Sequence, residues 1–208
     1  MFQTAAEAIG EVLSRGGWVM WPLGLLSLLA VTLIFERCWF WLSTSSGARR
    51  RRLDEIGRCL RAGQRPRAEH LAAVDTSVYG DLLQQLMAEG AGEASVSAGL
   101  ETQRPRLERF MPTLGTIITA APMLGILGTV TGIIRAFNVL SDKALTDPAE
   151  IAGPIAEALL TTVAGLVVAL VVLFPYNAFR AQIDRTVGRM HALVAAVRES
   201  RGEDESGT

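Results

Sequence analysis

The sequence predicts an all-α integral membrane protein with three transmembrane helices and a helical cytoplasmic subdomain. The chain has 208 residues, half of them apolar, and a net charge of −1. Three long stretches contain almost no charged residue, and the arginines gather between and after them. A helix rising ~1.5 Å per residue needs about 20 residues to cross a hydrocarbon layer of ~30 Å. Three such stretches in one short chain favour membrane spans over buried helices of a soluble protein.

The amino-terminal residues 1–16 are expected to form an amphipathic helix that lies on the outer surface of the membrane that the chain spans. Their apolar side chains recur at helical spacing, with Gln3, Glu7 and Glu11 on the opposite side. Gly16 and Gly17 would then bend the chain into the first span.

The transmembrane helices are expected at residues 17–42, 110–134 and 148–179. The first is built on WVMWPLGLLSLLAVTLIF and reaches full length once Gly17 and the Trp39–Trp41 aromatic belt are counted. Its flank has one base, Arg15, against two acids, whereas a cleaved signal peptide begins with a basic segment. We therefore interpret the first stretch as a membrane anchor.

The long segment 43–109 is expected to form a small helical subdomain. Apolar side chains recur at helical spacing in three groups, which lie at Leu53, Ile56, Cys59 and Leu60, at Ala68, Leu71, Ala72 and Val74, and at Leu82, Leu83, Leu86 and Met87. The last helix is expected to run toward the second span with a kink at Pro105. The run Arg49–Arg52 directly follows a span, which favours an anchor to anionic membrane lipid over nucleic-acid binding.

The distribution of Lys and Arg predicts the orientation. The loop from Thr44 to Arg109 contains eleven arginines and the tail from Arg180 five more, whereas the connection 135–147 contains only Arg135 and Lys143. By the positive-inside rule, the subdomain 43–109 and the carboxyl-terminal helix and tail 180–208 are cytoplasmic. The amino terminus and the short connection 135–147 are then outside.

The polar residue types exclude several function classes. Cys38 and Cys59 fit neither a disulfide framework nor a metal site, and His70 and His191 are expected at the surface. No nucleophile–base pair, metal cluster or phosphate-binding loop is recognisable, so neither an enzyme nor a bound cofactor is expected.

The third span carries the one acid in the apolar stretches, Glu157. The sequence Thr146–Glu150 is typical of a helix start, with Asp147 as cap and Pro148 in the first turn, so Glu157 lies about two turns inside. An acid in hydrocarbon costs roughly 2.5 kcal/mol or more and normally marks a pathway or a partner. The alternative is an acid at the interface, because a helix over 148–179 is longer than the bilayer core.

The polar neighbours of Glu157 favour a proton pathway. Thr161 lies one turn further along the same face, Thr162 is adjacent, and the second span carries threonines that include Thr129. Small residues that allow close helix approach accompany them, at Gly125, Gly128, Gly132 and Gly165. Threonines alone commonly bond to their own helix backbone.

Two strings in these spans resemble the MotA/TolQ/ExbB proton channel family, specifically its ExbB/TolQ branch. They are APMLGILGTVTGIIRAF at 121–137 and IAGPIAEALLTTVAGLVVALVVLFPYNAF at 151–179, with a weaker match at 16–37. The resemblance implies that Glu157 is the pore acid and that Thr129 and Thr162 are polar pore residues. The periodicity instead favours Thr161, which we keep as a weaker candidate. The MotA branch fits less well, because it has four spans and lacks the acid.

The resemblance also implies an assembly and a setting. Such proteins form a homopentamer around a central pore in the bacterial inner membrane, with a periplasmic amino terminus and a cytoplasmic carboxyl terminus. They hold an ExbD/TolR-like single-span partner with a membrane aspartate, and a TonB/TolA-like protein can be attached. The transported ion would be the proton, and the proton motive force would drive work on the cell envelope. The energised system stays open among nutrient uptake, envelope maintenance, gliding and secretion. The competing hypothesis is a non-conducting scaffold that assembles a single-span partner.

Overall fold

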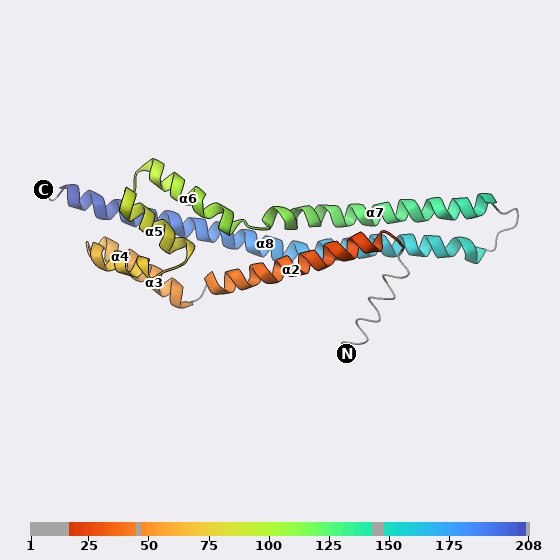
Figure 1. The fold of residues 1–208 in the computed structure, drawn as a ribbon, viewed down its shortest axis with the longest axis horizontal. Coiled ribbons are helices and arrows are strands. Elements are labelled where there is room, and N and C mark those ends of the chain that lie inside the picture. Colours follow the sequence, from red (N-terminus) through yellow and green to blue (C-terminus); the bar gives the residue numbers. More distant parts are fainter. Residues whose placement is uncertain (1–16, 45–46, 143–147, 207–208) are drawn as a thin grey trace. The chain divides into compact units, whose positions relative to one another are not determined.

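The structure is a computed structural model that describes residues 17–44, 47–142 and 148–206 (Figure 1). The amphipathic helix expected over residues 1–16 lies outside the described residues. All regular structure in the described part is helical, as the sequence predicts. The helices are α2 (Met20–Thr44), α3 (Gly47–Arg61), α4 (Arg65–Ala73), α5 (Val78–Glu89), α6 (Glu93–Leu107), α7 (Met111–Asp142) and α8 (Pro148–Ser206).

The chain folds as two compact units. One, the membrane unit, contains the first part of α2 up to Glu36 and the residues Phe110–Asn177 of α7 and α8. The other, the helical unit, contains Arg37–Arg109 and the chain from Ala178 onward. Helices α2 and α8 each contribute residues to both units.

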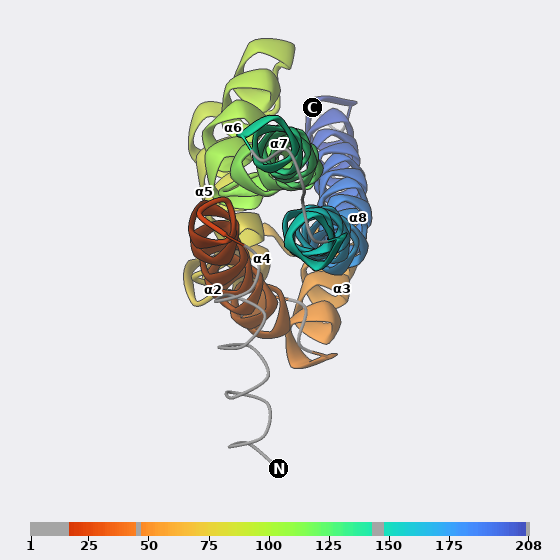
Figure 2. The same ribbon diagram turned by 90° about the vertical axis from the view of Figure 1, so that its right-hand side faces the viewer.

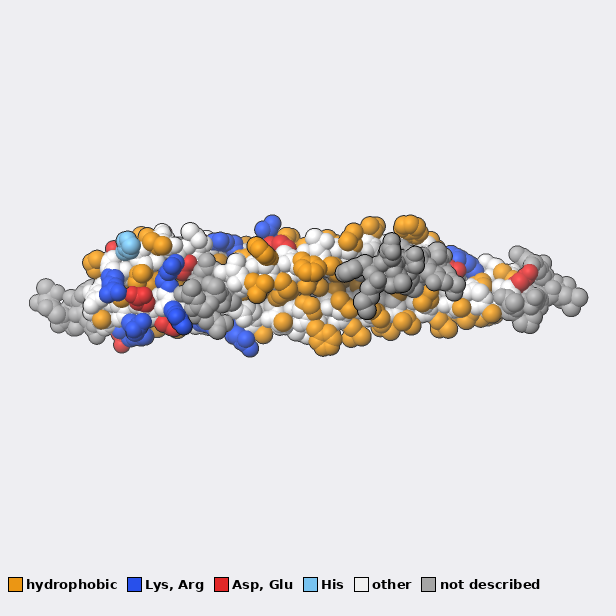
Figure 3. Space-filling model, turned by 90° about the horizontal axis from the view of Figure 1, so that it is seen from below, with side chains coloured by type: hydrophobic (Ala, Val, Ile, Leu, Met, Phe, Trp, Pro, Cys, Tyr) orange, Lys and Arg blue, Asp and Glu red, His pale blue; other side chains and the backbone are white. Residues whose placement is uncertain are grey.

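Three helices are long and apolar enough to cross a membrane, which confirms the expected number of spans. The stretches are Met20–Thr44, Met111–Ser141 and Glu150–Glu199. Most of their large apolar side chains point outward; Trp21, Phe35 and Phe174 are each about 70% exposed. Figure 3 shows hydrophobic side chains gathered over these helices. Water would make such exposure unfavourable, whereas lipid solvates it. The chain is therefore a multi-pass membrane protein.

The inside of the membrane unit is a narrow contact of small and medium side chains. Met20 and Leu23 of α2 pack with Ala121 of α7 in one buried cluster, and Leu124, Ala164 and Val168 border it. Figures 1 and 2 show α2, α7 and α8 running alongside one another at this level. Helix α7 continues to Asp142 because residues 135–142 contain neither glycine nor proline, so the segment expected as a connection is helical up to that residue.

The helical unit has a core of its own. Ile56, Leu60, Leu82, Leu83 and Leu86 are at most 1% exposed, as their helical spacing predicts. Val74 is expected on the apolar face of the second group but is 57% exposed, so this part of the prediction is wrong. The reason is that α4 ends at Ala73 and Val74 follows as its cap. His70 and His191 are exposed, as predicted.

The helix boundaries in this unit follow local rules. Gly63 and Gly90 adopt positive φ after α3 and α5, a conformation that a side chain disfavours. The side chain of Ser77 accepts a hydrogen bond from the Tyr79 amide and caps α5. Gly80 has no room for a side chain, because an added Cβ would collide with the carbonyl oxygen of Asp75.

The break before the second span lies after Pro105, which corrects the expected kink. Pro105 is accommodated inside α6, and the helix ends at Leu107. Phe110 then adopts φ of 65°, and α7 begins at the next residue. A left-handed phenylalanine is unfavourable and interrupts the helix more completely than a proline kink.

Arg37 is the large polar side chain buried most deeply in the helical unit. It is 1% exposed, and its guanidinium donates to the carbonyl oxygens of Arg106 and Leu107 at 3.2 and 3.4 Å. These carbonyls belong to the last turn of α6, where the helix itself offers no donor. The same guanidinium lies 4.6 Å from the ring centre of Phe40. Arg37 thus joins the carboxyl-terminal half of α2 to the end of α6.

Replacing Arg37 should destabilise the helical unit. An Arg37→Met variant keeps the apolar stem but leaves the two α6 carbonyls without this donor, at a cost of roughly 2 kcal/mol. We expect a lower thermal midpoint of the purified protein in detergent, followed by circular dichroism. The matched Arg180→Met variant removes an exposed arginine that lines neither groove of the helical unit, and it should leave the midpoint nearly unchanged. Equal midpoints for the two variants would contradict the role assigned to Arg37.

Candidate proton-pathway site

The site rests on a close contact between α7 and α8. Four glycines line it, and at each a side chain would collide with the opposite helix or come within 3.0 Å of it: Gly125, Gly128, Gly132 and Gly165. A Cβ on Gly132 would lie 2.5 Å from the Cβ of Ala158, and one on Gly165 would lie 2.5 Å from the Ala121 carbonyl oxygen. The two backbones therefore approach in a way that only glycine permits.

The threonines of α8 lie within this contact. Thr162 donates to the Gly125 carbonyl oxygen at 2.9 Å, which is a hydrogen bond between the two helices. Thr161 is 1% exposed, packs against Gly128, and donates to the Ala158 carbonyl oxygen of its own helix at 2.7 Å. The Thr161 hydroxyl also donates, at 3.4 Å, to the Gly125 carbonyl oxygen of α7, so both hydroxyls help to hold the helix pair together. Thr162 is the half-buried one of the two.

Thr129 lies on the same helix as Gly125 but outside the closest contact. Its hydroxyl donates to the Ile126 carbonyl oxygen at 2.6 Å, and its side chain is half-buried. This is the local backbone bond that threonines commonly make in helices. The structure thus brings Thr161 and Thr162 to Gly125, while Thr129 is bonded within α7.

Glu157 has a basic partner. Its carboxylate oxygen Oε1 accepts a hydrogen bond from a guanidinium nitrogen of Arg135 on α7 at 2.9 Å. The Glu157 side chain is 25% exposed and that of Arg135 45%. An ion pair stabilises the charged carboxylate at a place where loss of water would disfavour it. The acid of the third span is therefore neither isolated nor fully buried in this subunit.

The segment before α2 completes the site. Gly17 has φ of 66°, and a Cβ built on it would collide with the Glu157 carboxylate and lie 3.6 Å from the Arg135 guanidinium. The missing side chain leaves the space that the ion pair occupies. Three segments thus meet at one carboxylate: the residues just before α2, and the helices α7 and α8.

The position of Glu157 bears on its depth. Glu157 follows the first residue of α8 by nine positions, or about 14 Å of helix. Glu157 lies beside Gly17, and Gly17 precedes the first residue of α2 by three positions. This location suits the mouth of a pathway as well as the interfacial alternative.

Sequence reasoning missed Arg135 and Gly17 as parts of the site. In the sequence, Arg135 indicates only the orientation of the chain and Gly17 only a bend. The usable signal was the distance from the turn: Arg135 precedes the end of α7 by seven residues, and Glu157 follows the start of α8 by nine. Two antiparallel helices joined by a short connection bring such positions to similar heights.

Comparison with known proteins identifies the family. Residues 71–192, more than half of the chain, match the MotA/TolQ/ExbB proton channel family. The chain belongs to this family. The matched segment contains Glu157, Arg135, the three candidate threonines and the four glycines of the contact, whereas Gly17 lies outside it.

Individual relatives carry ExbB and TolQ names. The chain is 36% identical over 173 residues to the putative biopolymer transport protein ExbB-like 3 of Synechocystis, covering 80% of this chain and 82% of the relative. It is 35% identical over 185 residues to ExbB-like 1 of the same organism, covering 85% and 72%. The Tol-Pal system protein TolQ of Pseudomonas aeruginosa is 33% identical over 103 residues, covering 50% and 44%. Members of this family are membrane channel components and not enzymes.

The contact between α7 and α8 predicts a position-specific response to one methyl group. A Gly132→Ala variant places its Cβ against Ala158 and should lower the thermal midpoint in detergent, at a cost of roughly 1–3 kcal/mol. The Gly153→Ala variant is the matched control, because nothing lies within 4 Å of its Cβ. It should leave the midpoint unchanged or raise it slightly. The glycine contact would lose its support if both variants behaved alike.

Proposed function

We propose that the chain is an ExbB/TolQ-like proton-channel subunit, the stator of an inner-membrane motor that couples the proton motive force to mechanical work on the cell envelope. The observation that carries the proposal is Glu157, a carboxylate between membrane helices inside the segment that matches a proton channel family. The names of the chain's relatives point to biopolymer transport or to a Tol-type system. Biopolymer transport is the proposed setting, because the two ExbB-like relatives cover most of this chain.

The ion pair suggests how a proton could act on this subunit. Protonation of Glu157 would remove the charge that binds Arg135 and release the guanidinium. One elementary charge crossing 100 mV releases about 2.3 kcal/mol, whereas a partly exposed ion pair contributes roughly 1 kcal/mol or less. A single proton therefore carries enough energy to break the pair. Thr129 and Thr162, with Thr161 as the weaker candidate, would line the pathway beyond the carboxylate.

The proposed assembly is a homopentamer around a central pore, held in the bacterial inner membrane. The amino terminus is proposed to be periplasmic and the arginine-rich helical unit cytoplasmic, on the basis of the Lys and Arg distribution. An ExbD/TolR-like partner with a membrane aspartate and a TonB/TolA-like protein are the proposed partners, by analogy with the family. Protons are the only proposed ligand, and no nucleic acid is involved.

A second function, a non-conducting scaffold, is favoured by one observation. Arg135 already neutralises Glu157, and Thr161 and Thr162 are engaged in helix contacts. In a scaffold these groups would only hold helices together, and proton flux would not depend on any of them.

Neutralising Glu157 separates the two functions. In liposomes that hold the full complex with its single-span partner, a Glu157→Gln variant should lose at least about a hundredfold in proton flux, the scale of a lost proton-transfer group. The Glu150→Gln variant removes one carboxylate from the first turn of the same helix and should conduct normally. Undiminished flux through assembled Glu157→Gln complexes would rule out the proton role.

Arg135 should matter through its charge. An Arg135→Gln variant should reduce flux roughly fivefold, which corresponds to about 1 kcal/mol of ion-pair energy. Arg135→Lys keeps the charge and should restore most of the flux. The measurement is the same liposome assay, with assembly checked by size-exclusion chromatography. A Lys variant as defective as the Gln variant would speak against a charge-based role.

A further inference from the structure

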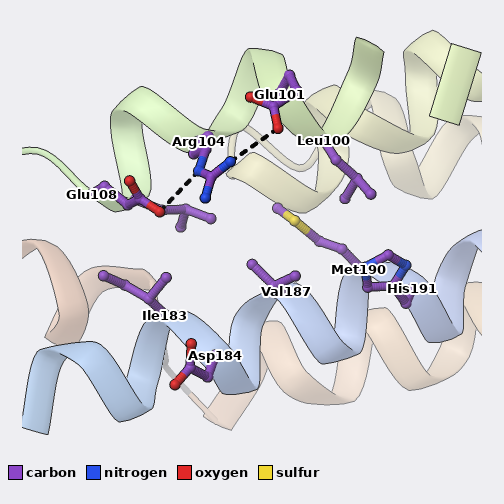
Figure 4. Close-up of a pocket in the computed structure, with 10 residues that line it drawn as sticks. Leu100, Glu101, Arg104, Glu108, Ile183, Asp184, Val187, Met190 and His191 are labelled. Carbon is purple, nitrogen blue, oxygen red and sulfur yellow. Dashed lines mark hydrogen bonds and ion pairs between the residues drawn. The ribbon is translucent and has the colours of Figure 1, made fainter. Parts of the chain in front are cut away.

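Helix α8 carries two open grooves on opposite faces within the helical unit. The first, here called the acidic groove, lies between residues 100–108 of α6 and residues 183–191 of α8 and has a volume of about 380 Å³ (Figure 4). The second, the basic groove, lies between residues 53–61 of α3 and residues 189–196 of α8, with about 390 Å³. Val187 lines the acidic groove and Arg189 the basic groove. These residues are two positions apart, which corresponds to about 200° around the helix, so the grooves lie on opposite faces.

The acidic groove has an apolar floor and an acidic edge. Ile183, Val187 and Met190 point from α8 toward α6 (Figure 4). Glu101, Glu108 and Asp184 supply three carboxylates against one arginine. That arginine, Arg104, is bound to Glu101 at 3.1 Å and to Glu108 at 3.0 Å, and these carboxylates raise its pKa. The surplus charge of this groove is therefore negative.

The basic groove has the opposite balance on a similar floor. Leu53 and Leu193 are buried beneath it. Arg58, Arg61 and Arg189 line it, and Asp54 is the only acid among its described lining residues. Within the described residues, none of these three guanidiniums is paired with a carboxylate. Arginines on an apolar floor without acidic partners suit carboxylates supplied from another surface.

Opposite charges on opposite faces of one helix are the pattern of a head-to-tail interface. Such an interface joins two different patches of the same chain, and its repetition gives a ring of identical subunits when the rotation between neighbours closes. Concave surfaces do not fill each other, so the contact must place the edge of one groove inside the other. The α6 edge carries Glu101 and Glu108, and the α3 edge carries Arg58 and Arg61.

We propose that a second copy of this chain occupies these grooves. The α6 edge of one copy lies in the basic groove of its neighbour, and the neighbour's α3 edge lies in the acidic groove of the first. Carboxylates and guanidiniums then pair across the contact while the apolar floors are covered. The inference rests on the proposed function only in assuming a ring of identical subunits, and it assigns the surfaces that join them.

Charge reversal of one groove at a time tests the interface. The full-length protein in detergent carries either Glu101→Arg with Asp184→Arg, or Arg61→Glu with Arg189→Glu. Each pair places like charges across the contact and should raise the concentration at which the oligomer dissociates by at least about tenfold. Native mass spectrometry over a dilution series measures this, and circular dichroism checks that the helices are intact.

The variant with all four changes restores opposite charges and should reassemble nearly as the unmodified protein does. Glu69→Arg with Glu89→Arg, two exposed acids outside both grooves, is the matched control and should assemble normally. Normal assembly of either single-groove variant, or a four-site variant that stays dissociated, would overturn the interface. Subunit number is measured without any proton gradient, so failure here leaves the Glu157 flux result untouched, and the reverse also holds.

Discussion

The glycine contact between α7 and α8 is the constraint on which the membrane unit depends. Between helices in lipid, burial of apolar surface supplies little driving force, so close packing and hydrogen bonds must stabilise the pair. Gly125, Gly132 and Gly165 bring the two backbones together, and this closeness lets the Thr162 hydroxyl reach a carbonyl of the other helix at 2.9 Å. Bulkier residues would remove both effects at once.

The same contact fixes the register that pairs Glu157 with Arg135. Ala158 packs against Gly132. Glu157 directly precedes Ala158, and Arg135 follows Gly132 by three positions, so the two charged residues lie at the same height. Gly17 leaves the space in which their side chains meet. A charged pair can persist there because each partner stabilises the other and both keep some access to solvent. Glu157 is thus held by the packing of three segments.

The spans and the helical core could be predicted from the sequence because they depend on periodicity and composition. Leu53, Ile56 and Leu60 are buried as their spacing indicates, and the three apolar stretches form long helices. The partner of Glu157 could not be predicted, because it depends on how two helices slide against each other. Helical spacing likewise put Thr161 on the face of Glu157 but did not reveal that Gly128 packs against its side chain. The left-handed Phe110 has no sequence signal, because glycine is the usual residue at such a φ.

The glycine contact between α7 and α8 and the Glu157–Arg135 ion pair differ in how easily a proton could change them. Separating α7 from α8 would open four glycine contacts and the Thr162 hydrogen bond together, and leaving a buried polar group unpaired costs about 1–3 kcal/mol by itself. A charge crossing 100 mV supplies about 2.3 kcal/mol, which exceeds the energy of the partly exposed Glu157–Arg135 pair but not that of the whole contact. A proton-driven movement in this subunit would therefore alter the ion pair while α7 and α8 move together. The segment at Gly17 lies against the ion pair without belonging to the glycine contact, so a change in the pair would act first on this segment.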